Sequence, residues 1–174
     1  DKRLVTEHPP EREIDFSAKY EGAEGKTVRW KRLFGRTAEP PKHIAELERG
    51  IGYRFHDILK PDEHVSVYAL TFVHVDEKTP VRLLIGSDDS VRCWINDEIV
   101  WSNPCIRGLS PNQDHVAATL KKGWNKVLLK VANNEGEWGF FFQIVDMDNQ
   151  LLWDLEVDPK AFYDASFRFG VKGI

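Results

Sequence analysis

Two adjacent carboxylates, Asp88 and Asp89, are the sharpest polar feature of the sequence, and they lie inside the turn-rich run Gly-Ser-Asp-Asp-Ser. Calcium takes about six to eight oxygen ligands from carboxylates, amides and water. Asn103, Asn133 and Asn134 could add amide oxygens from neighbouring loops. The spacing of an EF-hand loop is absent, however. In the alternative interpretation both carboxylates accept backbone N–H bonds and order the turn, so calcium at this pair is one of two hypotheses.

Several tryptophans lie beside turn residues, where aromatic side chains often form contact surfaces. The candidates for contact with a sugar are Trp94, Trp101, Trp124 and Trp138. An indole face packs against the C–H groups of a pyranose ring, and the sugar hydroxyls need polar partners beside it. The candidate partners are Arg92, Asn103, Asn133 and Asn134. The alternative for each tryptophan is a place in the core, although four of them near turns argue against all being core.

The face on which each tryptophan lies follows from strand alternation. Trp94 is flanked by Cys93 and Ile95, so it is expected on the opposite face of its strand, where it could face solvent with Arg92. Trp30 and Trp153 lie in the middle of strand-like runs and are assigned to packing.

Signals for catalysis are poor. The six histidines are scattered without the spacing of metal ligands. The sequence has no Gly-x-Ser-x-Gly elbow, no Walker loop and no His-Glu-x-x-His motif. It therefore predicts a binding protein and not an enzyme.

Composition argues against two classes of partner. The net charge of −4 gives no electrostatic reason to bind nucleic acid or an anionic membrane. No run approaches the roughly 18 apolar residues that a membrane helix needs.

The two cysteines, Cys93 and Cys105, are too few for a metal cluster. A disulfide between them would suit an exported protein, while the alternative makes Cys93 a small core residue.

The apolar pattern places these candidates on an all-β framework. Short β-prone runs with turns about every ten residues predict a two-sheet antiparallel β-sandwich, or jelly roll. The clearest runs are 65–75, 81–85, 91–95, 99–101, 115–120, 125–131 and 138–146. The stretch 81–100 is predicted to be a β-meander whose second turn needs positive φ at Asn96 or Asp97. One short helix is predicted between Ile44 and Gly50.

The 174 residues fit a single domain. Residues 1–26 are predicted to be an extended N-terminal arm that lies across the sandwich. Residues 27–157 form the sandwich, and residues 158–174 form a tail packed on it. The abrupt ends of the chain favour a module of a larger protein.

The run from Ser87 to Val100, SDDSVRCWINDEIV, resembles the galactose-binding-like and PA14-like β-sandwich modules. Those families have an Asp-Asp turn, a strand, an Asn-Gly or Asp-Gly hairpin and a returning strand. Residues 120–131, LKKGWNKVLLKV, resemble the Leu-x-x-Gly-x-Asn-x-Leu strand pair of jelly-roll sugar-binding domains attached to glycoside hydrolases. The resemblance covers about residues 65–157. Ser90 stands where PA14-like modules usually have glycine.

The resemblance implies a non-catalytic carbohydrate-binding module of an exported polysaccharide-active or cell-surface protein. Its partners would be an oligo- or polysaccharide and the neighbouring domains of a larger chain. In calcium-dependent PA14-like adhesins a similar pair of aspartates holds the ion. The alternative is a structural or protein-docking sandwich without a glycan site, in which the same tryptophans pack under the arm and the tail.

Overall fold

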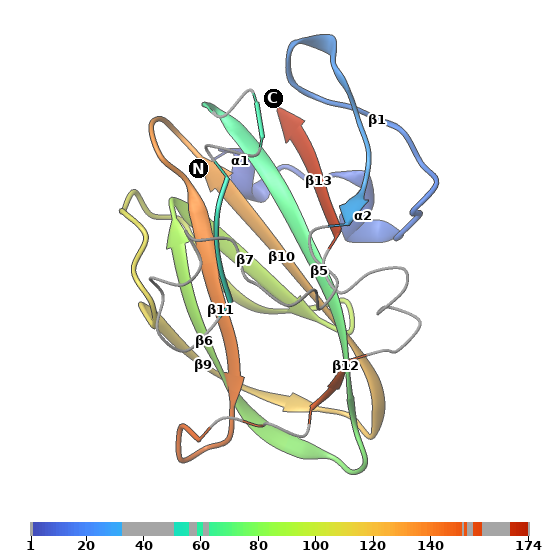
Figure 1. Cartoon of the computed structure of the whole chain (residues 1–174), viewed down its shortest axis with the longest axis vertical. Coiled ribbons are helices and arrows are strands. Elements are labelled where there is room, and N and C mark those ends of the chain that lie inside the picture. Colours follow the sequence, from blue (N-terminus) through green and yellow to red (C-terminus); the bar gives the residue numbers. More distant parts are fainter. Residues whose placement is uncertain are drawn as a thin grey trace.

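The computed structural model describes residues 2–32, 51–55, 59–60, 63–150, 152, 155–157 and 168–173. In these residues the fold is an all-β sandwich of antiparallel sheets, as the sequence predicts (Figure 1). The larger sheet has the order β3 (Lys31–Arg32), β13 (Arg168–Gly173), β5 (Val65–Val75), β10 (Gly123–Asn133), β7 (Ser90–Ile95) and β8 (Glu98–Asn103). A further strand, β12 (Glu156–Val157), also pairs with β5. The smaller sheet has the order β4 (Ile51–Arg54), β11 (Gly139–Val145), β6 (Thr79–Asp88) and β9 (Asp114–Leu120).

The hydrophobic core lies between the two sheets and is built from alternate residues of their strands. Val127, Leu129 and Val131 of β10 enter it from the larger sheet, and Phe140 and Phe142 of β11 enter it from the smaller one. The intervening residues of β10 point to the outer face of the larger sheet. The alternate residues that enter the core fix the register of the sandwich.

The predicted meander over 81–100 is wrong. β6 continues through Gly86, Ser87 and Asp88, which the sequence predicts as a turn, and it pairs with β9 and β11 of the smaller sheet. β7 pairs with β10 and β8 of the larger sheet. The chain therefore changes sheets at Asp89. Both strands have alternating apolar residues that face the shared core. Alternation alone cannot distinguish two strands in opposite sheets from two strands paired in one hairpin.

The turn between β7 and β8 is the hairpin that the sequence predicts. Asn96 and Asp97 both have positive φ, 50° and 72°, which suits a two-residue turn. The Asn96 side chain accepts a hydrogen bond from the Lys126 backbone at 3.0 Å and donates one to Asn125 at 2.8 Å. The hairpin is thus attached to β10 by side chains as well as by the sheet.

Asn125 holds the turn that leads from β9 into β10. Its side chain is fully buried and accepts from the Lys121 backbone N–H at 2.8 Å. It also donates to the carbonyl oxygens of Lys121 and Gly123, at 2.8 and 3.0 Å. Gly123 has a φ of +90°, a conformation that glycine adopts without strain.

The N-terminal arm lies on the outer face of the larger sheet and is not extended throughout. It contains two one-turn helices, α1 (Lys2–Val5) and α2 (Pro9–Arg12), and a small ribbon of β1 (Tyr20–Glu21) and β2 (Thr27–Val28). α1 contacts β5, β7 and β10. Just beyond the arm, Trp30 packs on Tyr68, Leu70, Trp94 and Leu128 of the sheet.

The remaining predicted elements agree with the structure only in part, and some lie outside the described residues. The described part of the C-terminal tail is a strand, β13, inserted between β5 and β3. Between residues 27 and 32, at the start of the predicted sandwich, the chain forms β2 and β3. The predicted helix between Ile44 and Gly50, and Trp153, lie outside the described residues. In the part of the chain that the structure describes, the helices are too short to cross a membrane.

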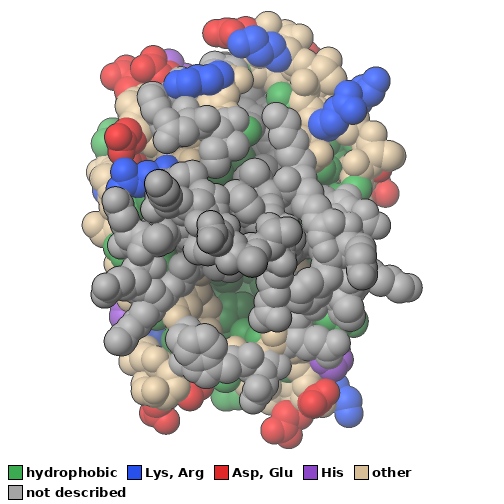
Figure 2. Space-filling model, viewed as in Figure 1, with side chains coloured by type: hydrophobic (Ala, Val, Ile, Leu, Met, Phe, Trp, Pro, Cys, Tyr) green, Lys and Arg blue, Asp and Glu red, His purple; other side chains and the backbone are tan. Residues whose placement is uncertain are grey.

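Figure 2 shows the same side of the molecule as Figure 1. On the visible part of this face that the structure describes, acidic and basic side chains lie at the rim and are interspersed. The net charge of −4 is therefore not gathered into one patch on the described part of this face.

Candidate functional site

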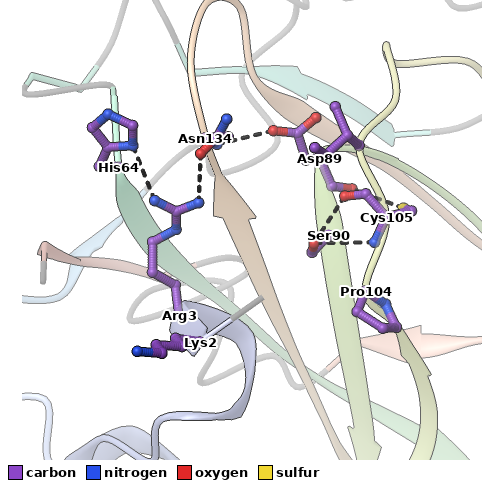
Figure 3. A pocket seen from close by; sticks show the side chains of 9 residues that line it. Lys2, Arg3, His64, Asp89, Ser90, Pro104, Cys105 and Asn134 are labelled. Atoms are coloured by element: carbon purple, nitrogen blue, oxygen red, sulfur yellow. Dashed lines mark hydrogen bonds between the residues drawn. The ribbon is translucent and has the colours of Figure 1, made fainter.

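A pocket of about 600 Å³ lies at one end of the sandwich, where five separate segments meet (Figure 3). The segments are α1, the residue before β5, the sheet-changing corner at the start of β7, the loop after β8, and the residue that follows β10. The residues that line it are Lys2, Arg3, His64, Asp89, Ser90, Pro104, Cys105, Ile106 and Asn134. Two of them, Asp89 and Asn134, are among the site residues that the sequence predicts.

Asp89 fixes this end of the fold. Its side chain is 5% exposed. One carboxylate oxygen accepts the backbone N–H of Arg107 at 3.0 Å, and the other accepts that of Asn134 at 2.9 Å. A carboxylate surrounded by N–H donors is satisfied as a hydrogen-bond acceptor and is poorly arranged for a cation. The contacts of Asp89 therefore match the alternative interpretation of the Asp pair, and among the described residues no group of three or more His, Cys, Asp and Glu side chains is placed to hold a metal ion.

Arg107 and Asp114 form a second anchor beneath the pocket. The Arg107 guanidinium donates to both Asp114 carboxylate oxygens, at 3.2 and 2.5 Å, and to the carbonyl oxygen of Ser87 at 3.1 Å. The Asn103 amide also donates to Asp114, at 3.0 Å. A Cβ at Gly86 would lie 1.9 Å from the Ser110 carbonyl oxygen, so glycine is required for the loop to pack on β6. The loop after β8 is thus held in a fixed shape.

The opposite wall of the pocket is formed by the arm. Arg3 lies against His64 Nδ1 at 3.0 Å and donates to Asn134 Oδ1 at 2.8 Å. In Figure 3 the guanidinium points toward these two side chains, across the pocket from Ser90 and Pro104. Arg3, His64 and Arg107 are not among the site residues that the sequence predicts. Their contacts join segments far apart in the chain, and no motif or periodicity marks them.

The predicted site residues divide into two groups. Asn103, Asn133, Asn134 and Asp89 gather at the pocket end, although Asn133 is fully buried. Trp138 is 1% exposed and packs on Phe55 with ring centroids 4.8 Å apart, so its indole is not available to a ligand.

Trp94 is on the outer face of the larger sheet, as predicted, but it does not face solvent. Trp30, just beyond the arm, packs with it, and Arg92 lies 5.9 Å from the centre of its ring. Trp101 is partly buried against the core. Trp124 is the exception, at 44% exposed, beside His74 and at the opposite end of β10 from the pocket. The prediction of a tryptophan platform is therefore wrong for Trp94 and Trp138.

The disulfide that the sequence left open is not formed. Cys93 and Cys105 are both free. Cys93 faces the core, where burial raises the pKa of its thiol, while Cys105 hydrogen-bonds Ser90 at 2.9 and 3.2 Å. Cys93 lies three positions after Ser90 in β7, about 10 Å along a strand, which is beyond the reach of a disulfide.

The pKa of Asp88 lies above that of a free aspartate. Burial raises the pKa of Asp88 to about 6, assisted by the charge of Asp89, although a hydrogen bond to the backbone of Leu109 opposes the rise. The folded state therefore keeps a proton that the unfolded chain loses near pH 4. The stability that Asp88 contributes is fully present below about pH 4 and is lost as the pH rises through about 6.

Asp88→Asn is accordingly expected to raise the free energy of unfolding at neutral pH by about 1 kcal/mol. A pKa change of this size is worth roughly 3 kcal/mol for a buried group, and solvent screening of the partly exposed side chain reduces it. Urea unfolding of both proteins in chelator, between about pH 4 and pH 7, measures the effect. The gap between the two proteins should widen with pH, and a constant gap contradicts the prediction. Adding calcium is the control, and it should leave the curves unchanged if Asp88 and Asp89 bind no ion.

Comparison with known proteins finds no match: no family model, no curated protein and no solved structure matches this chain. What is established is the class that the geometry defines, an all-β sandwich with an open pocket at one end.

Proposed function

We propose that this chain is a non-catalytic carbohydrate-binding module that holds a glycan in the pocket at the end of the sandwich. The observation that carries the proposal is the pocket itself. A cavity of about 600 Å³ accommodates one or two sugar rings and lies within the usual range of ligand sites. Its walls are held by the anchors at Asp89 and Arg107, so the site is formed before a ligand arrives.

The chemistry of the lining suits a ligand rich in hydroxyl groups. Arg3 supplies donors and Asn134 presents an amide, while the Ser90 hydroxyl is hydrogen-bonded to the Cys105 backbone. Ile106 is 84% exposed and stands with Pro104 at the rim, so it can meet the C–H face of a ring. Neither Phe, Tyr nor Trp is among the described lining residues, and the pocket is open. Weak binding is expected, because an open site buries only part of a ligand.

The resemblance of residues 87–100 and 120–131 to galactose-binding-like and PA14-like modules supports the same proposal. It also supports an exported polysaccharide-active or cell-surface protein as the host, with neighbouring domains as further partners. A carbohydrate module brings such a protein to its polymer.

Affinity electrophoresis through gels containing plant, algal and microbial polysaccharides tests the proposal. At least one polysaccharide should retard the chain. Asn134→Ala should reduce that retardation severalfold, because the amide is lost while the backbone N–H that binds Asp89 is kept. Trp124→Ala, at the far end of β10, is the matched control and should migrate like the parent. If Trp124→Ala alone loses retardation, the glycan binds on the sheet face and the pocket is not the site.

The second candidate function is a structural or protein-docking sandwich. The observation that favours it is the burial of Trp94 under the arm and of Trp138 in the core, since both are used in packing. Migration unaffected by every polysaccharide in a broad panel would support this candidate and contradict the first.

A further inference from the structure

We infer that Glu11 and Lys130 are positioning residues of this pocket: their buried pair holds α1 in place as a wall, so the ligand binds only while the arm is docked. The inference rests on the proposed function and adds what controls its site. Neither residue is among the described residues that line the pocket. Their effect passes through Lys2 and Arg3 of α1, which do line it.

Thr6 connects the buried pair to the pocket wall. Its carbonyl oxygen accepts a hydrogen bond from Lys130 Nζ at 2.5 Å, and the same amine donates to Glu11 at 2.9 Å. The backbone N–H and the hydroxyl of Thr6 both donate to the Lys2 carbonyl oxygen, at 2.9 and 2.7 Å. A single residue therefore joins the buried amine to the backbone of the wall.

Strand β10 holds the arm at two points. Lys130 binds Thr6 from within the strand, and Asn134, the residue after the strand, accepts from Arg3 at 2.8 Å. The two points are four positions apart, about 13 Å along a strand. The side chains of the pair are 0% exposed at Lys130 and 7% exposed at Glu11. Because breaking a buried pair is strongly destabilising, the attachment at Lys130 is expected to decide whether the arm stays docked.

The helix α1 cannot keep its position by itself. It is a single turn, Lys2–Val5, and isolated helices of this length are not stable in water. Its place depends on contacts with β5, β7 and β10, including the fully buried Leu4, and on the bond from Lys130 to Thr6. Without one member of the pair, the remaining charge is buried without its ionic partner, which favours release of the arm into water. Release would remove one wall of the pocket.

Ligand binding and docking of the arm should then be linked. A ligand that contacts the wall binds the docked state better than the released state, so it shifts the equilibrium toward docking. The coupling is reciprocal, because the factor by which docking strengthens ligand binding equals the factor by which the ligand strengthens docking. A pair with only a structural role would change the stability of the chain and leave the affinity of the folded protein unchanged.

NMR relaxation measures the docking of the arm without any ligand. In the parent chain, residues 2–6 should have backbone order parameters near about 0.85, the value of rigid backbone. In Glu11→Gln and in Lys130→Met they should fall below about 0.6. The order parameters of β11 should stay at the parent values, which shows that the sandwich is folded. Arg12→Gln breaks the exposed pair with Glu7 on the same arm and should resemble the parent.

Tyr68→Phe is a milder variant that keeps the inference testable if the charge variants do not fold. It removes the hydroxyl that donates to the same Glu11 oxygen at 2.5 Å and retains both charges. Its order parameters for residues 2–6 should lie below those of the parent and above those of Glu11→Gln.

Affinity electrophoresis with a polysaccharide that retards the parent measures the effect on the ligand. Glu11→Gln and Lys130→Met should lose apparent affinity at least about fivefold, the lower end of typical coupling between sites. Arg12→Gln should migrate like the parent. A soluble oligosaccharide of the same polymer, added to Glu11→Gln, should raise the order parameters of residues 2–6, which a purely structural pair does not predict.

The contrary outcomes are distinguishable. If residues 2–6 remain rigid in both charge variants, the buried pair does not position the wall. If the arm is released but retardation is unchanged, the ligand does not use the wall, and the inference fails while the proposed function stands. An equal loss in Arg12→Gln shows a general effect of charge on the arm and also rejects the inference. If no polysaccharide retards the parent chain, the proposed function itself fails, and the inference fails with it.

Discussion

Trp138→Ala is expected to lower the free energy of unfolding by about 3–5 kcal/mol, the usual cost of truncating a buried tryptophan. The indole is 1% exposed and packs on Phe55, whose backbone N–H also donates to the Trp138 carbonyl oxygen at 2.8 Å. Phe55 in turn packs on Phe140 of β11, at 5.7 Å between ring centroids. The truncation would therefore leave a cavity in the middle of an aromatic cluster that joins β11 to the chain after β4.

The measurement is urea unfolding of the parent, Trp138→Ala, and Trp124→Ala as the control. Trp124 is 44% exposed, so its truncation should change the unfolding midpoint little. Glycan binding separates structure from function in the same variants. If Trp138→Ala keeps its stability and loses its ligand, Trp138 is a contact residue after all, and the side chain must be accessible in solution.

Breaking the buried pair of Glu11 and Lys130 is expected to cost about 3–5 kcal/mol, because the charge left behind has no partner. Glu11 reaches from the arm to the outer face of the larger sheet. One of its oxygens accepts from Lys130 Nζ at 2.9 Å and from the Tyr68 hydroxyl at 2.5 Å. Lys130 Nζ also donates to the Thr6 carbonyl oxygen at 2.5 Å and lies 5.5 Å from the centre of the Tyr68 ring.

The protonation of this cluster follows from its burial. The Lys130 side chain is 0% exposed, and burial lowers the pKa of its amine, although the hydrogen bond with Glu11 opposes the change. Burial and the hydrogen bond to Glu11 raise the pKa of Tyr68. Each of the two charges stabilises the other in this buried site. The pair therefore anchors the arm to the sheet, and removing either partner breaks this anchor.

Urea unfolding of Glu11→Gln, Lys130→Met and the double variant tests this anchor. Each single change should cost about 3–5 kcal/mol, and the double variant should cost clearly less than their sum, since it leaves no buried charge unpaired. Arg12→Gln, which breaks the exposed pair with Glu7 on the same arm, should unfold nearly like the parent. Additive losses in the double variant would show that Glu11 and Lys130 act independently.

The polar half of the site was predictable, and the aromatic half was not. Asp89, Asn103 and Asn134 occur in turn-rich segments, and turns at one end of a sandwich converge whatever their sequence. Whether a tryptophan beside a turn is exposed depends on what packs against it. Trp94 has the alternation of an outer-face residue, and it lies on the outer face, but a segment more than sixty positions earlier in the chain covers it.

Local sequence determined the strand β5 over Val65–Val75 and the positive φ at Asn96 and Asp97. Apolar alternation and turn-forming residue types depend only on residues close together in the chain, so the sequence alone predicts both. Only the tertiary structure decided which sheet each strand joins, and hence that the chain changes sheets at Asp89. It also decided that the arm brings Arg3 to Asn134 and Glu11 to Lys130. These contacts join residues more than a hundred positions apart. Their geometry depends on the packing of the whole sandwich, and a local sequence pattern carries no information about that packing.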